Sequence, residues 1–550
     1  MLLAACNAPE TSSSKTTQTP TSIQNTPVIS EPASEPTPEP EAVPLAEPEP
    51  IAPELQTIGG YVVDIARDCD GYPRMKLATP EGLCVGLVVS KETPAKDGKA
   101  GLIFPRDIVF PRPDHQFNQE FYLTDMGGWG ENKGRVLLVD VGQIETVMDG
   151  LMLPHAIEYG PDGQIYVAEA DTLISFEPPP AKTDGFGYKR EIVNLPYKPG
   201  GAKHLHPLKA FTFSDANELW LNSGSLSDRC LDSLNFDVCT EARDAGTVLN
   251  FRKDGNLWTV NPDKIAFGLR NSMGLTTHSS GTVLQVENGA DFEDANSPFE
   301  EINRLDILPS PRRFYGWPYC FDRDEQDPDW GAKINYNCST YNPDYRFPIA
   351  LLPPHGAPLD LLYAPEGILN FEQEKLIVPL HGYREGGHRI LYFDVDEEGL
   401  PIGDAQELVF DWDASDTGPR GAPVGLTIGP DRAIWGVEDK NKTVFRVSVD
   451  KHLPQAWNDT SITTIVKVDE TYPTLQAEIF KPKCAACHVE FTGSAQASYQ
   501  ALHRVGWLGP ESILYERLLT PPPKQMPPDQ PLPQPDITKI KDWLETTTHR

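Results

Sequence analysis

Positive charge is scarce in this sequence. Its 550 residues contain 47 Lys and Arg against 80 Asp and Glu, which gives a formal net charge of -33 at pH 7. Nucleic-acid binding depends on clustered Lys and Arg that neutralise phosphates, so a chain this acidic argues against nucleic acid as a partner. The surplus of carboxylates instead favours solubility.

Long apolar runs are also absent. None approaches the roughly 20 residues that a membrane-spanning helix needs. Residues 16–55 contain no Lys or Arg, and Pro, Ser, Thr and Glu dominate there. Because that composition cannot bury apolar surface, residues 7–55 are predicted to form a stiff, self-repelling linker.

The first residues, Met1-Leu-Leu-Ala-Ala-Cys6, resemble the end of a bacterial lipoprotein signal. Such a signal is cut before the cysteine, whose thiol is then acylated. The resemblance implies that residues 1–6 are a signal remnant and that lipid on Cys6 is the only membrane anchor. We therefore expect a protein of the bacterial cell envelope, in the periplasm or on the surface, held at the outer membrane. A chance Leu-Ala-Ala-Cys is the alternative.

Six of the nine cysteines fall into three near pairs: Cys69 with Cys84, Cys230 with Cys239, and Cys320 with Cys338. Near pairs favour three local disulfides, formed in an oxidising compartment. Six cysteines permit many other pairings, so the connectivity stays open at the level of sequence.

The segment Cys484-Ala-Ala-Cys487-His488 predicts covalent haem attachment. Each thiol can form a thioether to one haem vinyl group, and the adjoining His488 is placed to bind the iron. Half of a zinc site and a redox dithiol are the alternatives. Zinc would need a second Cys or His pair, which the C-terminal residues lack, and a dithiol does not need the histidine.

Met526 is the single methionine after His488, and prolines stand on both sides of it. A rigid proline-flanked loop suits a thioether that must stay on the iron, so Met526 is the predicted second axial ligand; an ordinary loop methionine is the alternative. Behind Asp536, a predicted N-cap, apolar residues recur at helical spacing: Ile537, Ile540, Trp543 and Leu544. Residues 471–550 thereby resemble a small class I cytochrome c domain, after a linker at residues 451–470. The resemblance implies an all-α fold and transport of single electrons.

Residues 56–450 consist of short β-rich runs divided by Gly, Asp and Pro turns, with almost no long helical period. A turn followed by a strand returns at irregular intervals, as at residues 121–124, 136–139, 164–168, 218–221, 282–286, 375–378 and 433–437. This pattern fits a β-propeller of six four-stranded blades better than a sandwich. The predicted fold class is mainly β: a six-bladed β-propeller followed by a small all-α domain.

Several segments of this region match a known family in their order along the chain. They are residues 206–213, 219–225, 264–275, 286–291, 301–303 and 315–318, together with residues 355–358, 381–382 and 421–425. Residues 100–450 thereby resemble the soluble quinoprotein glucose, aldose and sorbosone dehydrogenases. The resemblance implies a propeller that binds pyrroloquinoline quinone (PQQ) and calcium.

The resemblance also implies a catalytic base. The segment that carries the family's catalytic histidine matches His206 of this chain, and His204 is the alternative. A histidine with a pKa near neutrality suits removal of a hydroxyl proton while hydride leaves the carbon.

Cofactor ligands follow from the same match. Arg270, with Asn271, would hold quinone carboxylates through its guanidinium fork, and Arg384 and Arg389 loosely match a later arginine pair. Calcium, held by the backbone carbonyls of Gly289 and Ala290, would polarise the quinone carbonyl. Residues 363–367 lack the lysine that grips the cofactor in the glucose dehydrogenases.

The sequence therefore predicts a lipid-tethered quinohaemoprotein dehydrogenase. The propeller would oxidise a sugar or a related alcohol or aldehyde, and the fused cytochrome would pass the electrons to a respiratory acceptor, a cytochrome or a quinone. Trp129, Trp317 and Tyr319 would stack on a sugar ring, unless they are blade contacts. Two alternatives are a calcium-dependent lactonase and a cofactor-less propeller that binds carbohydrate or protein.

Overall fold

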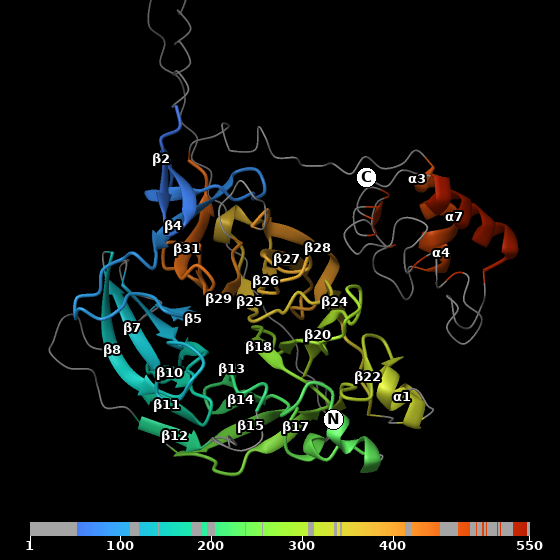
Figure 1. The fold of residues 1–550 in the computed structure, drawn as a ribbon, viewed down its shortest axis with the longest axis horizontal. Coiled ribbons are helices and arrows are strands. Elements are labelled where there is room, and N and C mark those ends of the chain that lie inside the picture. The colour runs from blue at the N-terminus through green and yellow to red at the C-terminus, as the bar shows by residue number, and fades with distance from the viewer. Residues whose placement is uncertain are drawn as a thin grey trace, which may run out of the picture. The chain divides into compact units, whose positions relative to one another are not determined.

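The structure is a computed structural model, shown in Figure 1. It describes residues 52–110, 120–140, 142–178, 190–194, 204–236, 238–255, 257–305, 313–334, 338–341, 344–412, 420–451, 471–484, 491, 495, 498–499, 502, 514, 518 and 532–546. The predicted signal remnant with Cys6, the linker over residues 7–51 and the linker over residues 452–470 lie outside these residues.

The region from Pro105 onwards is mainly β, and the predicted β-propeller class is confirmed. Five sheets follow one another along the chain, antiparallel except for one short marginal strand of the third sheet. The first contains β5 (Pro105–Val109), β6 (Phe121–Asp125), β7 (Gly134–Asp140) and β8 (Gln143–Leu151). The second contains β9 (Ile157–Tyr159), β10 (Ile165–Ala168), β11 (Thr172–Phe176) and β12 (Arg190–Asn194). The third contains β13 (Phe211–Asp215), β14 (Glu218–Ser223), β15 (Thr247–Asp254) and β17 (Asp263–Phe267), with β16 (Leu257–Trp258) and β21 (Arg313–Phe314) at its margins.

The fourth sheet contains β18 (Ser272–Thr277), β19 (Val283–Glu287), β20 (Glu300–Arg304) and β24 (Ala350–Leu352). The fifth contains β25 (Leu362–Ala364), β26 (Lys375–Leu380), β27 (Arg389–Val395) and β28 (Pro401–Val409). Figure 1 shows the first strands β5, β13, β18 and β25 nearest the centre of a ring, with later strands further out. The strands that the alternating sequence pattern predicted at residues 121–124, 136–139, 164–168, 218–221, 282–286, 375–378 and 433–437 are all present.

A seven-stranded antiparallel sheet closes the ring. It joins β29 (Pro423–Ile428), β30 (Ile434–Glu438) and β31 (Thr443–Val449) to β4 (Leu83–Val89), which comes from the start of the domain. Beyond β4 the sheet continues through β3 (Tyr72–Met75), β2 (Tyr61–Cys69) and β1 (Leu55–Ile58). Strand β4 pairs along its length with β31, so the two ends of the propeller sequence share one hydrogen-bonded ladder.

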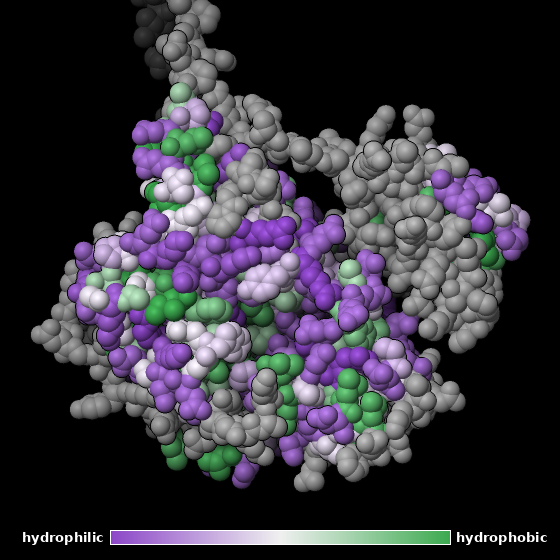
Figure 2. Space-filling view, viewed as in Figure 1, coloured by the Kyte–Doolittle hydropathy of each residue, from purple (hydrophilic) through white to green (hydrophobic). Residues whose placement is uncertain are grey.

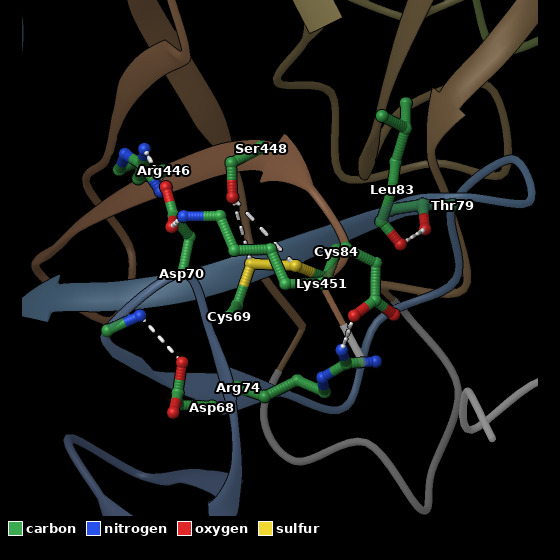
Figure 3. Close-up of a disulfide and its surroundings, with 12 residues drawn as sticks. Asp68, Cys69, Asp70, Arg74, Thr79, Leu83, Cys84, Arg446, Ser448 and Lys451 are labelled. Carbon is green, nitrogen blue, oxygen red and sulfur yellow. Dashed lines mark hydrogen bonds and ion pairs between the residues drawn. A yellow bond between two sulfur atoms is a disulfide. The ribbon is translucent and has the colours of Figure 1, made fainter. Parts of the chain in front are cut away.

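Figure 3 shows how this junction is tied. The disulfide between Cys69 and Cys84 links β2 to β4, and Cys69 Sγ lies 3.3 Å from the Ser448 hydroxyl of β31. Arg74 of β3 forms a buried ion pair with Asp450, which directly follows β31. Covalent and ionic contacts therefore hold the N-terminal strands against the last strand of the ring.

A carboxylate recurs at the end of the second strand in four sheets. Asp125, Glu169, Glu287 and Glu438 accept backbone N–H groups from the loop that enters the first strand of the same sheet, at distances of 2.6–2.9 Å. Buried N–H groups need such acceptors, because a missing bond costs about 1–3 kcal/mol. The loops before first strands and after second strands therefore gather on one face of the ring, which we call the mouth.

Apolar side chains fill the space between neighbouring sheets. Val109 and Tyr122 of the first sheet pack on Ile157 and Val167 of the second, all at most 7% exposed. Burying an aliphatic side chain of this size contributes roughly 1.5–3 kcal/mol, so these interfaces hold the sheets in order around the ring. The face of the propeller seen in Figure 2 is mainly hydrophilic.

All three predicted disulfides are present. Cys230–Cys239 lies between β14 and β15, near the 3-10 helices η1 (Leu231–Phe236) and η2 (Glu241–Arg243). Cys320–Cys338 ties the long connection from β20 to β24, which contains β22 (Cys320–Phe321), β23 (Glu325–Gln326), α1 (Pro328–Ile334) and α2 (Cys338–Tyr341). Local pairing was therefore correct at each position.

The C-terminal region is helical where it is described. It contains α3 (Tyr472–Leu475), a π-helical turn η5 (Gln476–Phe480), α4 (Lys481–Lys483) and α7 (Gln534–Thr546). The residues predicted at helical spacing, Ile537, Ile540, Trp543 and Leu544, are buried in one apolar cluster. Asp536 is not the N-cap, because α7 already begins at Gln534 and places Asp536 in its first turn. Among the described residues, no helix is both long and apolar enough to cross a membrane.

Candidate active site

The mouth brings most of the predicted propeller site residues to one face of the ring. His206 and Arg270 precede the first strands β13 and β18, whereas Gly289, Ala290 and Arg384 follow the second strands β19 and β26. In an up-and-down sheet, the start of the first strand and the end of the second lie at the same end. Residues far apart in sequence therefore share this face.

His206 is buried beside the strand that follows it. Its Nδ1 lies 2.8 Å from the Ser225 hydroxyl and 3.0 Å from the Ser225 carbonyl, while Nε2 has no hydrogen bond to a described residue. Burial, with Arg270 adding to it, holds the pKa of His206 well below its usual value. Gly224 permits this approach, since a Cβ there would lie 2.6 Å from His206 Cβ. The imidazole is therefore neutral and fixed in orientation.

Arg270 is surrounded by protein acceptors. Its Nε donates to Asp228 at 2.8 Å, and its terminal nitrogens donate to the Asn288 carbonyl at 3.0 Å and to Asp291 at 2.9 Å. The side chain is only 5% exposed. Asp291 and Asp228 neutralise this guanidinium. The charge of Arg270 is therefore already compensated before any ligand binds.

Gly289 and Ala290 line a cavity together with Arg270, Glu301 and Trp317. The Gly289 N–H donates to buried Glu300 at 2.6 Å, and the same carboxylate accepts the Ala357 N–H at 2.9 Å. Burial raises the pKa of Glu300 to about 7. The loop predicted to hold calcium is thus anchored by a carboxylate below it, and the calcium assignment stays a prediction.

Asn271 lies next to Arg270 at the entrance to β18. Its backbone N–H donates to Glu287 at 2.8 Å, and its side-chain oxygen Oδ1 is buried without a hydrogen-bond partner among the described residues. Ser272 Oγ donates to the same Glu287 at 3.0 Å, and burial raises the pKa of Glu287 to about 7. An unmatched buried acceptor marks the place where a ligand could donate a hydrogen bond.

The later arginines and the aromatic residues have contacts of their own. Arg389 pairs with Glu407 at 2.8 Å, and Arg384 donates to the Phe292 carbonyl at 3.1 Å. Trp317 donates its indole N–H to the Asp228 carbonyl at 2.8 Å and packs beside the Cys230–Cys239 disulfide. The Tyr319 hydroxyl accepts the Cys239 N–H at 2.9 Å. Trp129 is 62% exposed. Trp317 and Tyr319 therefore stabilise the connections between strands.

The structure adds a buried polar network that sequence reasoning missed. His381 Nε2 lies 3.0 Å from Asp439, whose other oxygen forms an ion pair with Arg106, and Arg106 Nε donates to His155 Nδ1 at 3.2 Å. Burial alone would raise the pKa of Asp439, but His381 and Arg106 hold it below its usual value. Burial and Arg106 hold the pKa of His155 well below its usual value. The one sequence signal was the segment His381-Gly382, whose resemblance was noted without a role.

The predicted haem ligands are only partly visible. Cys484 directly follows α4, is half-buried, and donates its backbone N–H to the Phe480 carbonyl at 2.8 Å. It packs against the apolar cluster that contains Trp543. Cys487, His488 and Met526 lie outside the described residues, so the haem assignment stays a prediction.

The ring of radial sheets places the chain in the class of β-propeller proteins. Within that class, a family model described as TrAA12-like matches residues 129–450, which is more than half of the chain. The chain therefore belongs to the TrAA12-like family.

Two sequence relatives are informative. An uncharacterized protein of Borreliella burgdorferi is 27% identical over 325 residues, which cover 56% of this chain and 79% of that protein. The pyrroloquinoline quinone-dependent pyranose dehydrogenase of Coprinopsis cinerea is 30% identical over 142 residues. That match covers 22% of this chain and only 19% of the enzyme's own length, so the likeness to it is local.

Solved structures share the fold. The holo form of the pyranose dehydrogenase PQQ domain from Coprinopsis cinerea has a TM-score of 0.51 at 20% identity, covering 69% of this chain and 99% of that domain. A calcium structure of the Trichoderma reesei family AA12 enzyme also gives 0.51, at 19% identity, covering 68% of this chain and 98% of that one. At this identity the likeness shows the fold alone.

Proposed function

We propose that this protein is a PQQ-dependent dehydrogenase that oxidises a sugar or a related alcohol or aldehyde. Membership of the TrAA12-like family and the local likeness to a PQQ-dependent pyranose dehydrogenase support the proposal. The observation that carries it is the pair of fixed histidines at the mouth, His206 on Ser225 and His381 on Asp439. We count the antiparallel sheet of β29–β31 with β4 as the sixth blade of the ring.

The mouth fits a flat, polar cofactor. Asn271 Oδ1 is a buried acceptor without a partner among the described residues, and Nε2 of His206 has no hydrogen bond to a described residue. Asn271 and the Gly289–Ala290 carbonyls would hold the quinone and its calcium. Bound PQQ would supply an acceptor for the two electrons that leave the substrate carbon as hydride.

The remaining task, removal of the hydroxyl proton, belongs to the protein. His381 suits it best, because Asp439 fixes its ring and stabilises the imidazolium that forms on proton uptake. Nδ1 of His381 makes no hydrogen bond to a described residue, so it can face a substrate. His206, which the sequence predicted as the base, is buried against Ser225 and is the second candidate.

Electrons would then leave through the C-terminal region. Cys484, Cys487, His488 and Met526 form the predicted haem c site, and fusion on one chain makes the transfer intramolecular at high effective concentration. Lipid on Cys6 would keep this assembly at the cell envelope, near a respiratory acceptor. Both statements extend the dehydrogenase proposal to parts of the chain outside the described residues.

Anaerobic spectroscopy tests the proposal. Full-length protein loaded with PQQ and calcium is mixed with a panel of aldoses, oligosaccharides and sugar aldehydes, and the reduced haem band is followed without a mediator. We expect at least one pyranose to reduce the haem. If no sugar or aldehyde does so in protein shown to hold PQQ, the propeller is a binding module instead.

Histidine variants assign the base. His381→Ala should slow sugar-dependent reduction by on the order of 100-fold or more, the usual size of a lost general base, while dithionite still reduces the haem. His206→Ala should cost less, since its neutral ring has no carboxylate support. A larger loss for His206→Ala than for His381→Ala would return the role of base to His206.

A further inference from the structure

One equivalent position recurs at or just before the start of the first strand in each of the six sheets of the ring. The strand register defines this position through one matching residue pair between the first and second strands of each sheet. The pairs are Ile108 with Leu123, Ile157 with Val167, Phe211 with Leu221, Leu275 with Gln285, and Leu426 with Gly436. The equivalent position lies two residues before the first-strand member of each pair. In the fifth sheet this position is Leu359, two residues before Leu361. We call these residues the inner ring: Arg106, His155, Lys209, Met273, Leu359 and Val424, all at most 9% exposed.

The inner ring is divided into two halves. Met273, Leu359 and Val424 join one apolar cluster, whereas Arg106, His155 and Lys209 stand on three successive sheets. His155 and Lys209 are neighbours in space, because the Ala156 N–H donates to the Lys209 carbonyl at 3.3 Å. One side of the ring is therefore basic, directly below the mouth that carries His206.

Only one of the three polar members has an uncompensated charge. Arg106 is paired with Asp439, and His155, whose pKa is low, is neutral. Lys209 is 0% exposed, and its Nζ has no hydrogen-bond partner among the described residues. Burial lowers the pKa of Lys209 only to about 8, so the ammonium form still dominates at pH 7. Its charge also lowers the pKa of His204 and His206, which places it near both rings.

An unpaired buried ammonium is costly, because removing it from water is not offset by any counter-charge. The apolar residues at three equivalent positions show that the fold does not need a charge there. A bound carboxylate would supply the missing acceptor and turn the cost into a charge-assisted hydrogen bond. Arg270 and Arg106 suit this task less well, since protein carboxylates already neutralise both.

We propose that Lys209 is the cation that receives a carboxylate of the quinone cofactor, in place of the lysine that residues 363–367 lack. This inference rests on the proposed function. Lys209 lies three residues after His206 and just before β13, within the segment 206–213, whose resemblance assigned no role to this lysine. The apoprotein holds the ammonium without a counter-ion, and the holoprotein supplies one.

Equilibrium binding of PQQ to Lys209→Met tests the proposal. Methionine keeps most of the unbranched stem but has no charge, so the dissociation constant should rise by about 10- to 100-fold, the worth of one charge-assisted hydrogen bond. The unfolding temperature of the apoprotein should stay the same or rise, because an unpaired buried charge is removed. Lys375→Met is the matched control: Lys375 of β26 is paired with Asp394 of β27, and its loss should leave PQQ affinity unchanged.

Two further readouts separate a carboxylate contact from a packing effect. The trimethyl ester of PQQ, which has no carboxylate, should bind the parent and Lys209→Met equally. Binding of PQQ at pH 8.5 should take up protons in the parent, since a carboxylate raises the pKa of the ammonium, and not in the variant. PQQ binding that Lys209→Met leaves unchanged rejects this inference alone. Failure of the parent to bind PQQ rejects the proposed function and this inference with it.

Discussion

Single buried carboxylates hold the loops of the mouth. Glu287 accepts hydrogen bonds from the Arg270 and Asn271 N–H groups and from Ser272 Oγ, and Glu300 anchors Gly289 and Ala357. Burial raises the pKa of each carboxyl to about 7. A free glutamate titrates near pH 4.5. Between about pH 4.5 and 7 the folded state therefore binds more protons than the unfolded state.

Stability should therefore fall as pH rises from about 5 to about 7 and then level off. Each carboxyl contributes up to roughly 3 kcal/mol to that change. Glu287→Gln keeps the shape and the acceptor oxygen but does not titrate, so its unfolding free energy should vary less over the same range. Urea denaturation at pH 5.5 and 8 measures the difference. The exposed Glu366→Gln is the control and should follow the parent; equal pH dependence in Glu287→Gln would contradict the assignment.

Residues that lie close together in sequence were the predictable ones. Arg270, Asn271 and Gly289 could be proposed from the sequence because each belongs to a contiguous family motif. Arg106 and Asp439 meet across a separation of 333 residues and only when the ring closes, so no local pattern joins them. Lys209 was overlooked because its burial depends on the sheets on both sides, whereas the sequence alone shows an ordinary lysine between Leu208 and Ala210.

At the scale of elements, the N-terminal strands act as a clamp. Strands β2–β4 add to the closing sheet, and the Cys69–Cys84 disulfide links β2 to β4 across a separation of 15 residues. Arg446 of β31 pairs with Asp70 at 2.6 Å in the turn between β2 and β3. The clamp therefore couples the first strands of the domain to the last.

Removal of this disulfide should loosen the closure. The double variant Cys69→Ser with Cys84→Ser should lose about 2–4 kcal/mol, the usual value for a loop of this length. Amide hydrogen exchange should speed up in β4 and β31 before it does so in the other sheets. Cys320→Ser with Cys338→Ser is the matched control, because that bond ties only the connection between β20 and β24. Equal protection of β31 in both double variants would show that the disulfide does not support the closure.

Strand positions were predictable from alternation and turns, but sheet membership was not. No sequence pattern indicated that β1–β3 would join the same sheet as β29–β31. The start of α7 was missed by three residues, because a proline at its second position begins the helix before Asp536. Such boundaries depend on backbone geometry rather than on hydrophobic period.

At the scale of the whole molecule, the proposed electron path depends on one methionine. Met526→Ala should leave haem covalently attached through Cys484 and Cys487 but lower its reduction potential, since a thioether ligand raises it. The sulfur-to-iron absorption band at the red edge of the spectrum should disappear, and sugar-dependent haem reduction should slow. Met152→Leu, a buried propeller residue, is the control. An unchanged band would show that Met526 is not the ligand.

Closure by β4 also sets an order of events during synthesis. Residues 83–89 leave the ribosome early, yet their ladder partner at residues 443–449 follows more than 350 residues later. Until then β4 presents an unpaired edge, a feature that exposes nascent chains to aggregation and slows folding. The C-terminal region is translated only after β31. The propeller therefore has every strand it needs before the Cys484–His488 segment emerges, and haem attachment would be the later step.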